Sequence, residues 1–304
     1  MTTPEEPDHG LSAIMSERRQ LINLAYRLLG SLADAEDVVQ ETYARWYAMT
    51  RPQQEAIESP GAWLTTVAGR ICLDLLRSAR ARRERYVGQW IPEPVPESTE
   101  WVSARRGDAD PADRITLDES VNMAFMVVLE SMTPAERVAF VLHDVFRYSF
   151  AEVAEIVGRT PAACRQLASS ARRRIRDSQA PATPAPQRAD VVSKFKQAWK
   201  AGDIQGLISV LDPDAVATGD GGGLVTAVAR PVNGAVPIAQ FFVELSTGLA
   251  GMTLIERTVN GQPGLAIEHD GATVAVLAFD VADDRIRNIW TVLNPEKLRP
   301  WTVG

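Results

Sequence analysis

Apolar side chains recur at helical spacing along most of the first 178 residues. Between residues 11 and 28 they return every three or four positions, which is the period of an amphipathic helix. Gly30 ends this helix, and Ser31 with Asp34 provides a start of the capping-box type for the next one. The pattern predicts helices over 11–29, 33–49, 60–85, 114–131, 134–145, 150–157 and 161–177, and a polar loop over 50–59.

The helical pattern is interrupted twice and then replaced. Residues 86–112 and 179–187 are rich in proline and show no sustained period, so we predict linkers there. Helical spacing resumes over 189–201 and 204–211 and then gives way to β-type segments. The predicted strands cover 215–218, 224–230, 254–259, 265–269, 273–280 and 285–293, the last two joined by Ala282-Asp283-Asp284 as a hairpin link.

These changes of pattern predict a multidomain chain. Helices followed by a sheet indicate an α+β domain of about 115 residues at the C-terminal end, after two all-α domains. The predicted parts are a tail over 1–10, a helical domain over 11–85, a linker over 86–112, a helical domain over 113–178, a linker over 179–187 and an α+β domain over 188–304.

The charge of the chain is unevenly distributed. A formal net charge of −7 argues against a general affinity for nucleic acid. The first 187 residues nevertheless contain 22 Arg and no Lys, and the windows 70–85 and 159–176 hold six Arg each. A solvated helix face would explain one such run, whereas two runs on predicted helices favour contacts with phosphates.

The second arginine run belongs to a predicted helix-turn-helix over 149–176. A short amphipathic helix is followed by a tight turn at Gly158, and Thr160 and Pro161 suit the cap and first position of a second helix. That second helix is basic and contains no acidic residue before Asp177. Two helices about a turn of this length, the second one basic, are typical of a DNA-binding motif.

Other residue types exclude several classes of protein. Cys72 and Cys164 fall inside predicted helices without paired spacing, so neither a disulfide framework nor a zinc site is indicated. The three His residues are far apart, and we expect no metal and no cofactor. The sequence contains no run of about 18 apolar residues and no signal-peptide core at its N-terminus, so we expect a cytoplasmic protein with no membrane partner.

The helix that begins near Ala33 carries a cluster of polar and acidic side chains. They are Asp34, Glu36, Asp37, Gln40 and Glu41. Acidic residues in a first turn also balance the helix dipole; the functional alternative is a docking face for a basic partner helix. Aromatic residues follow at Tyr43, Trp46, Tyr47 and Trp63, and such residues belong to a core or stack on unpaired bases.

Two long segments carry a specific resemblance. LADAEDVVQETYARWY followed by SPGAWLTTVAGRICLDLLRSARARR resembles region 2 of the bacterial extracytoplasmic-function sigma factors. LESMTPAERVAFVLHDVFRYSFAEVAEIVGRTPAACRQLASSARRRIR resembles region 4 of the same family. The two segments stand in the family's order with a linker between them, which is more specific than a helix-turn-helix alone.

The resemblance implies partners and residue roles. Core RNA polymerase would be bound at its β′ clamp and β flap, with Asp34, Glu36, Asp37, Gln40 and Glu41 at the clamp. The loop over 50–59 would hold a flipped base of the −10 promoter element, and Trp63, Arg70, Asp74 and Arg77 would lie along that element. Arg165, Gln166, Ser169, Arg172 and Arg173 would face the −35 element, where Arg and Gln can recognise base edges.

The C-terminal part is similar to the SnoaL-like cone domain of the nuclear-transport-factor type, which is fused to one subgroup of these sigma factors. Three motifs carry this similarity: YVGQWIPEP over 86–94, DGGG over 220–223 and NPEKL over 294–298. The subgroup implies a domain that modulates sigma activity on the same chain, with no separate anti-sigma factor. The residues that we expect to make regulatory contacts are Asp220, Gly221, Gly222, Gly223, Asn294, Pro295 and Lys297.

Cone domains of this type can also be isomerases or cyclases that use a carboxylate or a histidine as a base. Asp212, Asp214, Asp220 and His269 are the candidates, but Asp212 and Asp214 flank a proline as turn residues do. The glycines beside Asp220 suit a backbone role at an interdomain contact, and we expect no catalysis. Two alternatives remain: a DNA-binding regulator whose cone binds an unknown small ligand, and a cone enzyme fused to a DNA-binding part.

Overall fold

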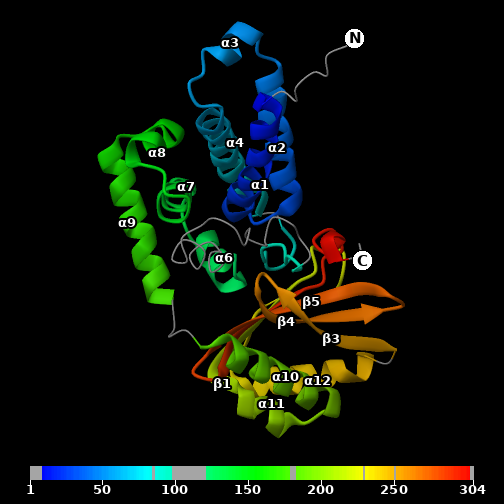
Figure 1. The fold of residues 1–304 in the computed structure, drawn as a ribbon. Helices are drawn as coiled ribbons and strands as arrows, with labels where there is room; N and C mark the ends of the chain where they lie inside the picture. The colour runs from blue at the N-terminus through cyan, green and yellow to red at the C-terminus, as the bar shows by residue number, and fades with distance from the viewer. Residues whose placement is uncertain are drawn as a thin grey trace, which may run out of the picture. The chain divides into compact units, whose positions relative to one another are not determined.

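The computed structural model describes residues 9–83, 86–97, 121–178, 183–228, 230–249 and 251–301, with the side chains of 9–16, 79–83 and 249 excepted. The chain forms two compact units (Figure 1). The first contains residues 1–80 and 132–174, and the second contains residues 81–131 and 175–304. No helix within the described ranges is long and apolar enough to cross a membrane.

The first unit is helical. Its elements are α1 (His9–Leu29), α2 (Leu32–Tyr47), α3 (Arg51–Glu55), α4 (Pro60–Arg83), α7 (Pro134–Phe140), the π-helix η1 (Val141–Val145), α8 (Phe150–Val157) and α9 (Pro161–Ser178). Ser31 caps α2 by accepting a hydrogen bond from the backbone N–H of Asp34 at 3.2 Å. Gly158 ends α8 with a φ of 71°, a conformation that glycine adopts without strain.

The loop predicted over 50–59 contains a short helix, α3. Thr50 precedes it, and the side chain of Gln53 accepts hydrogen bonds from the backbone N–H and the hydroxyl of Thr50. Pro52 stands in the first turn, where its missing N–H costs nothing. These local contacts explain why a polar stretch without an apolar face forms one turn of helix.

The second unit contains the C-terminal domain and the helix α6. Its helices are α6 (Met123–Glu130), α10 (Ala185–Ala201), α11 (Ile204–Val210), α12 (Ala235–Ser246), η2 (Thr247–Leu249) and η3 (Arg299–Trp301). Its strands are β1 (Leu211–Asp220), β2 (Val232–Asn233), β3 (Met252–Val259), β4 (Gln262–His269), β5 (Ala272–Ala282) and β6 (Arg285–Val292). In the described residues they form one six-stranded sheet in the order β2-β1-β6-β5-β4-β3, in which only the β1–β6 pair is parallel.

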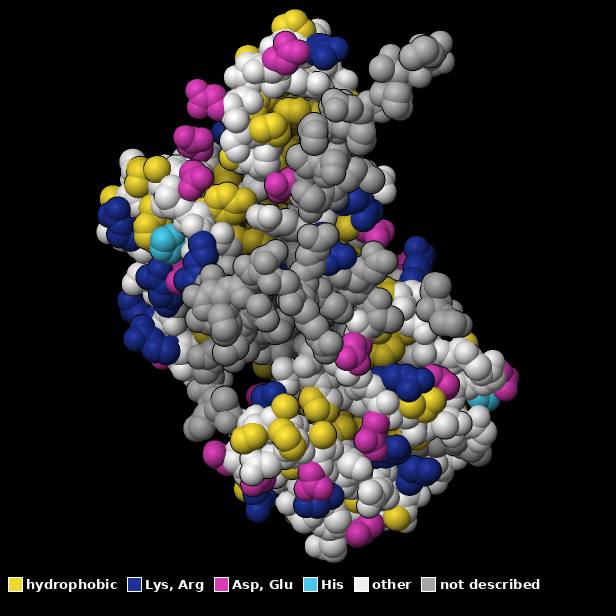
Figure 2. All heavy atoms as spheres, in the orientation of Figure 1, with side chains coloured by type: hydrophobic (Ala, Val, Ile, Leu, Met, Phe, Trp, Pro, Cys, Tyr) yellow, Lys and Arg dark blue, Asp and Glu magenta, His cyan; other side chains and the backbone are white. Residues whose placement is uncertain are grey.

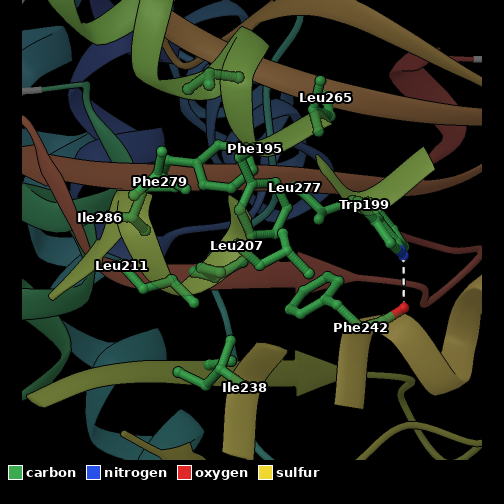
Figure 3. Close-up of a cluster of buried hydrophobic side chains, with 14 of the residues drawn as sticks. Phe195, Trp199, Leu207, Leu211, Ile238, Phe242, Leu265, Leu277, Phe279 and Ile286 are labelled. Carbon is green, nitrogen blue, oxygen red and sulfur yellow. Dashed lines mark hydrogen bonds between the residues drawn. The ribbon is translucent and has the colours of Figure 1, made fainter. Parts of the chain in front are cut away.

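The two faces of this sheet are covered by different parts of the chain. The inner face packs against α10, α11 and α12 (Figure 1). Phe195, Trp199, Phe242 and Phe279 fill the space between helices and sheet, and the indole of Trp199 donates a hydrogen bond to the carbonyl oxygen of Phe242 at 2.7 Å (Figure 3). The outer face packs against Ile91 of the first predicted linker and against Met123 of α6.

The expected fold class is confirmed: two helical regions precede an α+β domain. Several further details were wrong. The described part of 224–230 is not a strand, because the backbone N–H groups of Leu224 and Val225 turn back to the carbonyl oxygen of Gly221 and β2 takes the place beside β1. Helix α12 was missed, and α10 begins at Ala185, inside the second predicted linker. Residues 114–120 of one predicted helix lie outside the described residues.

Candidate functional sites

Helix α9 presents a basic face to solvent. Its buried side chains are Cys164, Ala168, Ala171 and Ile175, spaced three or four residues apart. The opposite face carries the exposed residues Arg165, Gln166, Ser169 and Arg173. Basic side chains gather over α9 in Figure 2. Thr160 caps the helix by accepting a hydrogen bond from the backbone N–H of Ala163 at 3.2 Å.

Two other arginines of α9 are paired with acidic side chains of the preceding helices. Arg172 Nε lies 2.5 Å from Asp144 Oδ1, and Arg174 Nε lies 4.0 Å from Glu136 Oε1. Burial alone would raise the pKa of Glu136, but hydrogen bonds from Ser170 and Thr133 and the charge of Arg174 bring this pKa below its ordinary value. The pairs therefore fix how α9 is seated on α7 and η1.

Helix α2 separates an apolar face from an acidic one. Ala35, Val38, Val39 and Thr42 are buried, whereas Glu36, Asp37, Gln40 and Glu41 are exposed. Asp34 is half-buried next to the cap at Ser31. Glu41 also pairs with Arg45 at 2.8 Å on the exposed surface. The predicted polymerase-binding residues other than Asp34 thus form one continuous solvent-facing strip.

The predicted −10 residues lie along α4 in different surroundings. Trp63 is half-buried, with its ring edge-on to Trp46 at a centroid distance of 5.3 Å. Asp74 and Arg77 are exposed and pair at 3.2 Å. Arg70 is exposed but donates a hydrogen bond to the carbonyl oxygen of Glu155 in α8 at 3.0 Å. Arg70, a predicted DNA contact, is thus hydrogen-bonded to the helix-turn-helix segment.

Further contacts join residues between 137 and 156 to α1 and α4. Gly69 lets the side chain of Ile156 approach the α4 backbone so closely that a Cβ would lie 2.8 Å from it. The hydroxyls of Thr65 and Tyr148 lie 2.8 Å apart. The guanidinium of Arg137 donates to the carbonyl oxygen of Leu28 at 2.9 Å, and its burial lowers the pKa of Arg137 to about 9. Within the first unit, the two helical regions therefore pack against each other.

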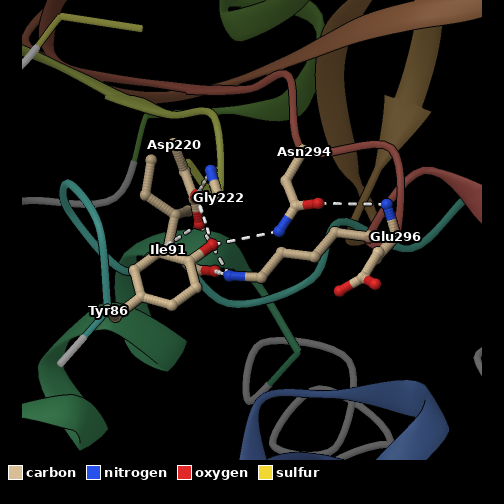
Figure 4. Close-up of polar contacts among 7 residues, drawn as sticks. Tyr86, Ile91, Asp220, Gly222, Asn294 and Glu296 are labelled. Atoms are coloured by element: carbon tan, nitrogen blue, oxygen red, sulfur yellow. Dashed lines mark hydrogen bonds and ion pairs between the residues drawn. The ribbon is translucent and has the colours of Figure 1, made fainter. Parts of the chain in front are cut away.

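A buried polar cluster brings the three motifs of the second unit together (Figure 4). Asp220 ends β1 with no exposed surface. Its carboxylate accepts hydrogen bonds from the hydroxyl of Tyr86 at 2.6 Å, from the backbone N–H groups of Ile91 and Gly222, each at 3.0 Å, and from the ammonium of Lys297 at 2.6 Å. The carboxylate therefore accepts four hydrogen bonds: two from the linker, one from its own loop and one from the segment that follows β6.

Lys297 is the cation of this cluster. Only 5% of it is exposed, and its ammonium also donates to the carbonyl oxygen of Ile91 at 2.5 Å and lies 3.2 Å from the centre of the Trp90 ring. Asn294 donates to the hydroxyl of Tyr86 at 3.0 Å. Burial, followed by the hydrogen bond to Asp220, raises the pKa of Tyr86 above its ordinary value. The ion pair is buried and hydrogen-bonded on both sides, which is the condition under which such a pair is stable.

The glycines next to Asp220 allow the close approach of other chain segments. Gly222 has a φ of 62° and a Cβ there would lie 2.3 Å from the Asn294 side chain, and Gly223 has a φ of 73° and faces Val87. Gly221 and Pro295 accept backbone hydrogen bonds in the turns of their motifs. Larger side chains at Gly222 or Gly223 would therefore separate the loop from its neighbours.

The β3–β4 turn holds a residue that the sequence reasoning missed. Asn260 is completely buried and its side chain contacts the backbone of both Val95 and Val121. The available signal was the dipeptide Asn260-Gly261, which predicts a two-residue hairpin turn. That signal predicts the turn but not the contacts.

The candidate catalytic groups do not assemble into one site. Asp212 accepts a hydrogen bond from the backbone N–H of Asp214, as in a turn, and His269 stands exposed at the end of β4. Asp220 is occupied by the contacts described above. Among the residues that the structure describes, no group of three or more His, Cys, Asp or Glu side chains could hold a metal ion.

Comparison with known proteins covers nearly the whole chain. Residues 13–82 match the family described as Sigma-70 region 2, and residues 122–175 match Sigma-70, region 4. The chain is 39% identical over 293 residues to the ECF RNA polymerase sigma factor SigJ of Mycobacterium tuberculosis, covering 92% of this chain and 90% of the relative. It is 34% identical to the probable sigma factor SigI of the same species, over 95% and 94% of the two chains. The crystal structure of M. tuberculosis SigJ matches with a TM-score of 0.73 and 37% identity, covering 95% of this chain and 98% of that one.

Proposed function

This chain belongs to the extracytoplasmic-function RNA polymerase sigma factors, and we propose how its parts divide the work of starting transcription. It is an alternative sigma factor for transcription initiation. The exposed acidic strip of α2, formed by Glu36, Asp37, Gln40 and Glu41, binds the β′ clamp of core polymerase, and region 4 binds the β flap. The carboxylates of α2 are exposed to solvent, and their charge is complementary to that of a basic helix of the clamp.

Promoter recognition is divided between α4 and α9. Along α4, Trp63, Arg70, Asp74 and Arg77 contact the −10 element, and the segment over 50–59 holds an extruded base. On α9, Arg165, Gln166, Ser169 and Arg173 face the −35 element from the exposed side of the helix. Arg172, which is paired with Asp144, acts mainly by positioning α9.

The C-terminal domain regulates the sigma regions by holding the linker between them. The buried cluster of Asp220, Lys297, Tyr86 and Asn294 is the observation that carries this proposal. It joins the start of the linker to the cone through charge-assisted hydrogen bonds, which are stronger than neutral ones. A regulator fused in this way takes the place of a separate anti-sigma factor, and we assign no covalent chemistry to it.

Run-off transcription with purified core polymerase tests the proposal. Full-length protein is compared with chains truncated after Leu298 and after Gln187, and with Asp220→Asn. We expect core binding in every case and altered transcription from the Gln187 truncation and from Asp220→Asn. Equal transcription by all four proteins would refute regulation by the C-terminal domain, and a failure of the full-length protein to associate with core would refute the sigma-factor roles assigned to α2 and α9.

A further inference from the structure

One side chain of the C-terminal domain binds two distant points of the chain. Oδ1 of Asn260 accepts a hydrogen bond from the backbone N–H of Val95 at 2.9 Å. Nδ2 of the same amide donates to the carbonyl oxygen of Val121 at 2.9 Å. Val95 lies in the linker after region 2, and Val121 lies directly before the match to region 4 begins at residue 122. Asn260 therefore holds two points of the chain that connects the two regions, and one of them lies directly before region 4.

The contact to Val95 is supported by the backbone around it. The N–H of Asn260 donates to the carbonyl oxygen of Val95 at 2.8 Å, and Pro96 forms an antiparallel bridge with Val259. Strand β3 is at the edge of the sheet, so the linker covers the end of an otherwise open edge. The hydroxyl of Thr258 adds a hydrogen bond to the carboxylate of Glu97 at 2.9 Å.

The contact to Val121 fixes the start of α6. The next residue, Asn122, caps α6 by accepting a hydrogen bond from the backbone N–H of Phe125 at 2.7 Å. From there α6 places Met123, Ala124 and Val127 against the outer face of the sheet. The first helix of region 4 therefore belongs to the same compact unit as the cone, whereas α7, α8 and most of α9 belong to the other.

We propose that Asn260 is a positioning residue, a clasp that limits how far regions 2 and 4 can separate; this rests on the proposed function above. With both bonds made, the Val95 nitrogen and the Val121 oxygen are on the order of 8 Å apart, the length of two hydrogen bonds and one amide. With the Val121 bond and the packing of α6 on the sheet both released, the chain between Val95 and Val121 could extend to roughly 90 Å. The closed clasp favours the compact arrangement of the two regions, and the open one favours the extended arrangement.

The promoter requires the longer reach. The names of the −35 and −10 elements place them about 25 base pairs apart, which is roughly 85 Å along B-DNA. In the first unit, by contrast, Arg70 of region 2 is bound to Glu155 of region 4. A protein that engages both elements must separate the two regions, and the clasp opposes that separation by the difference in its contacts between the two states.

A second turn of the same sheet offers a matched control. Asn260-Gly261 and Asp270-Gly271 both have positive φ at both residues: 51° and 72° in the first, 49° and 77° in the second. The Asp270 side chain is 92% exposed, and that of Asn260 is buried. Glycine adopts positive φ without strain, so Asn260→Gly and Asp270→Gly make the same backbone change, and only the first removes the clasp.

The experiment combines hydrogen exchange with run-off transcription on the full-length protein. In Asn260→Gly we expect faster exchange at the amide of Val95 and in peptides covering 121–130, with β5 unchanged. We expect transcription with core polymerase to rise by up to roughly thirty-fold, the effect of losing two hydrogen bonds of ordinary net strength. Asp270→Gly should behave as wild type in both measurements. Asn260→Asp keeps the acceptor for Val95 and loses the donor to Val121, so exchange should rise over 121–130 only.

Several outcomes would overturn the clasp. Exchange over 95 and 121–130 that is equal in Asn260→Gly and Asp270→Gly would show that the contact does not hold the linker. Faster exchange with unchanged transcription would show that the contact holds the linker without regulating initiation. Failure of the proposed function has a different signature, because wild-type protein would then support no transcription with core at all.

Discussion

The two faces of the C-terminal sheet are packed by different partners. The inner face is covered by α10, α11 and α12 of the same domain. The outer face is covered by Ile91 of the linker, Met123 of α6 and Leu298 of the chain end, and the partly buried Trp301 joins them. Its indole donates a hydrogen bond to the carbonyl oxygen of Pro94 at 2.8 Å. The inner face thus makes the domain fold, while the outer face makes it an attachment surface.

The difference shows where regulation can act without unfolding the domain. The inner core is apolar, and the indole N–H of Trp199 donates its hydrogen bond to an acceptor in the same domain, the carbonyl oxygen of Phe242 (Figure 3). The outer face adds buried polar contacts to residues that are distant in sequence, through Asp220, Lys297 and Asn260. Polar contacts of this kind are directional, and a competing hydrogen-bond partner can break them while the domain stays folded. A close-packed apolar core, by contrast, can only be opened by unfolding the domain.

The largest expected effect is at the inner face. Phe242→Ala removes a side chain that is 2% exposed and packs edge-on against Phe195 and Trp199. We expect the domain to lose about 3–5 kcal/mol of its free energy of unfolding, measured by hydrogen exchange of β4 and β5. Leu245→Ala, on the exposed side of the same helix, is the control and should change exchange little. A small effect of Phe242→Ala would contradict a filled inner core.

The ion pair of the outer face comes next. Lys297→Met leaves the carboxylate of Asp220 buried without its cation, and such a change costs about 3–5 kcal/mol when the remaining charge stays buried. We expect the loss to appear as faster exchange over 86–97, with β4 and β5 less affected. The double variant Asp220→Asn with Lys297→Met should recover much of the protection, since it leaves no unpaired charge. Additive losses in the double variant would show that the two groups do not act as a pair.

Ile91→Ala tests the apolar half of the same attachment. Ile91 is 1% exposed but belongs to the linker, so its truncation weakens docking without opening a cavity between the domain's own strands. We expect the linker's docking to weaken by about 2 kcal/mol, seen in exchange over 86–97, and the midpoint of thermal unfolding of the cone to stay close to wild type. Val87→Ala, 67% exposed on the same segment, should leave both measurements unchanged. Equal effects of the two substitutions would indicate that Ile91 is not buried in solution.

The smallest effect is expected from Tyr86→Phe. It removes one of four donors to Asp220 and should weaken linker docking by about 1 kcal/mol. Because burial raises the pKa of Tyr86, the folded state favours the protonated phenol. The stabilisation that the phenol gives to linker docking is therefore complete below the ordinary tyrosine pKa of about 10 and is lost as the pH rises above that value. In wild-type protein, this loss should accelerate hydrogen exchange over 86–97 as the pH rises, beyond the ordinary effect of pH on exchange. Tyr86→Phe should lack this additional acceleration, and identical pH profiles of the two proteins would contradict the contact.

The sequence could predict much of the local structure because local signals decide it. The helix-turn-helix follows from Gly158, Thr160 and Pro161, and the exposed face of α9 follows from its apolar period. Three short motifs were expected to make the regulatory contacts of the C-terminal domain, and the structure places Asp220, Asn294 and Tyr86 of these motifs within hydrogen-bond distance of one another. The regulatory role of these residues stays a prediction.

Other features had no local signal. Helix α12 begins after Gly234 without a side-chain cap, and its apolar residues, including Phe241 and Phe242, could equally belong to a strand. The apolar run after Gly223 resembles a strand in sequence, but its first backbone N–H groups bond back to the carbonyl oxygen of Gly221, and β2 is the strand that pairs with β1 on this side. Pairing partners are chosen by the whole sheet, and β propensity alone does not determine them.

The amino-acid sequence by itself determined the order of the parts, most of the helices with their caps, the position of the basic face and the hairpin turns at Asn260 and Asp270. Each of these depends on neighbours within a few residues, and the spacing of apolar, polar and glycine positions records them. Only the tertiary structure decided that the turn at Asn260 is buried against two segments of the interdomain chain while the turn at Asp270 faces solvent. The two turns have the same local chemistry, and what separates them is which distant backbone groups need a hydrogen-bond partner there.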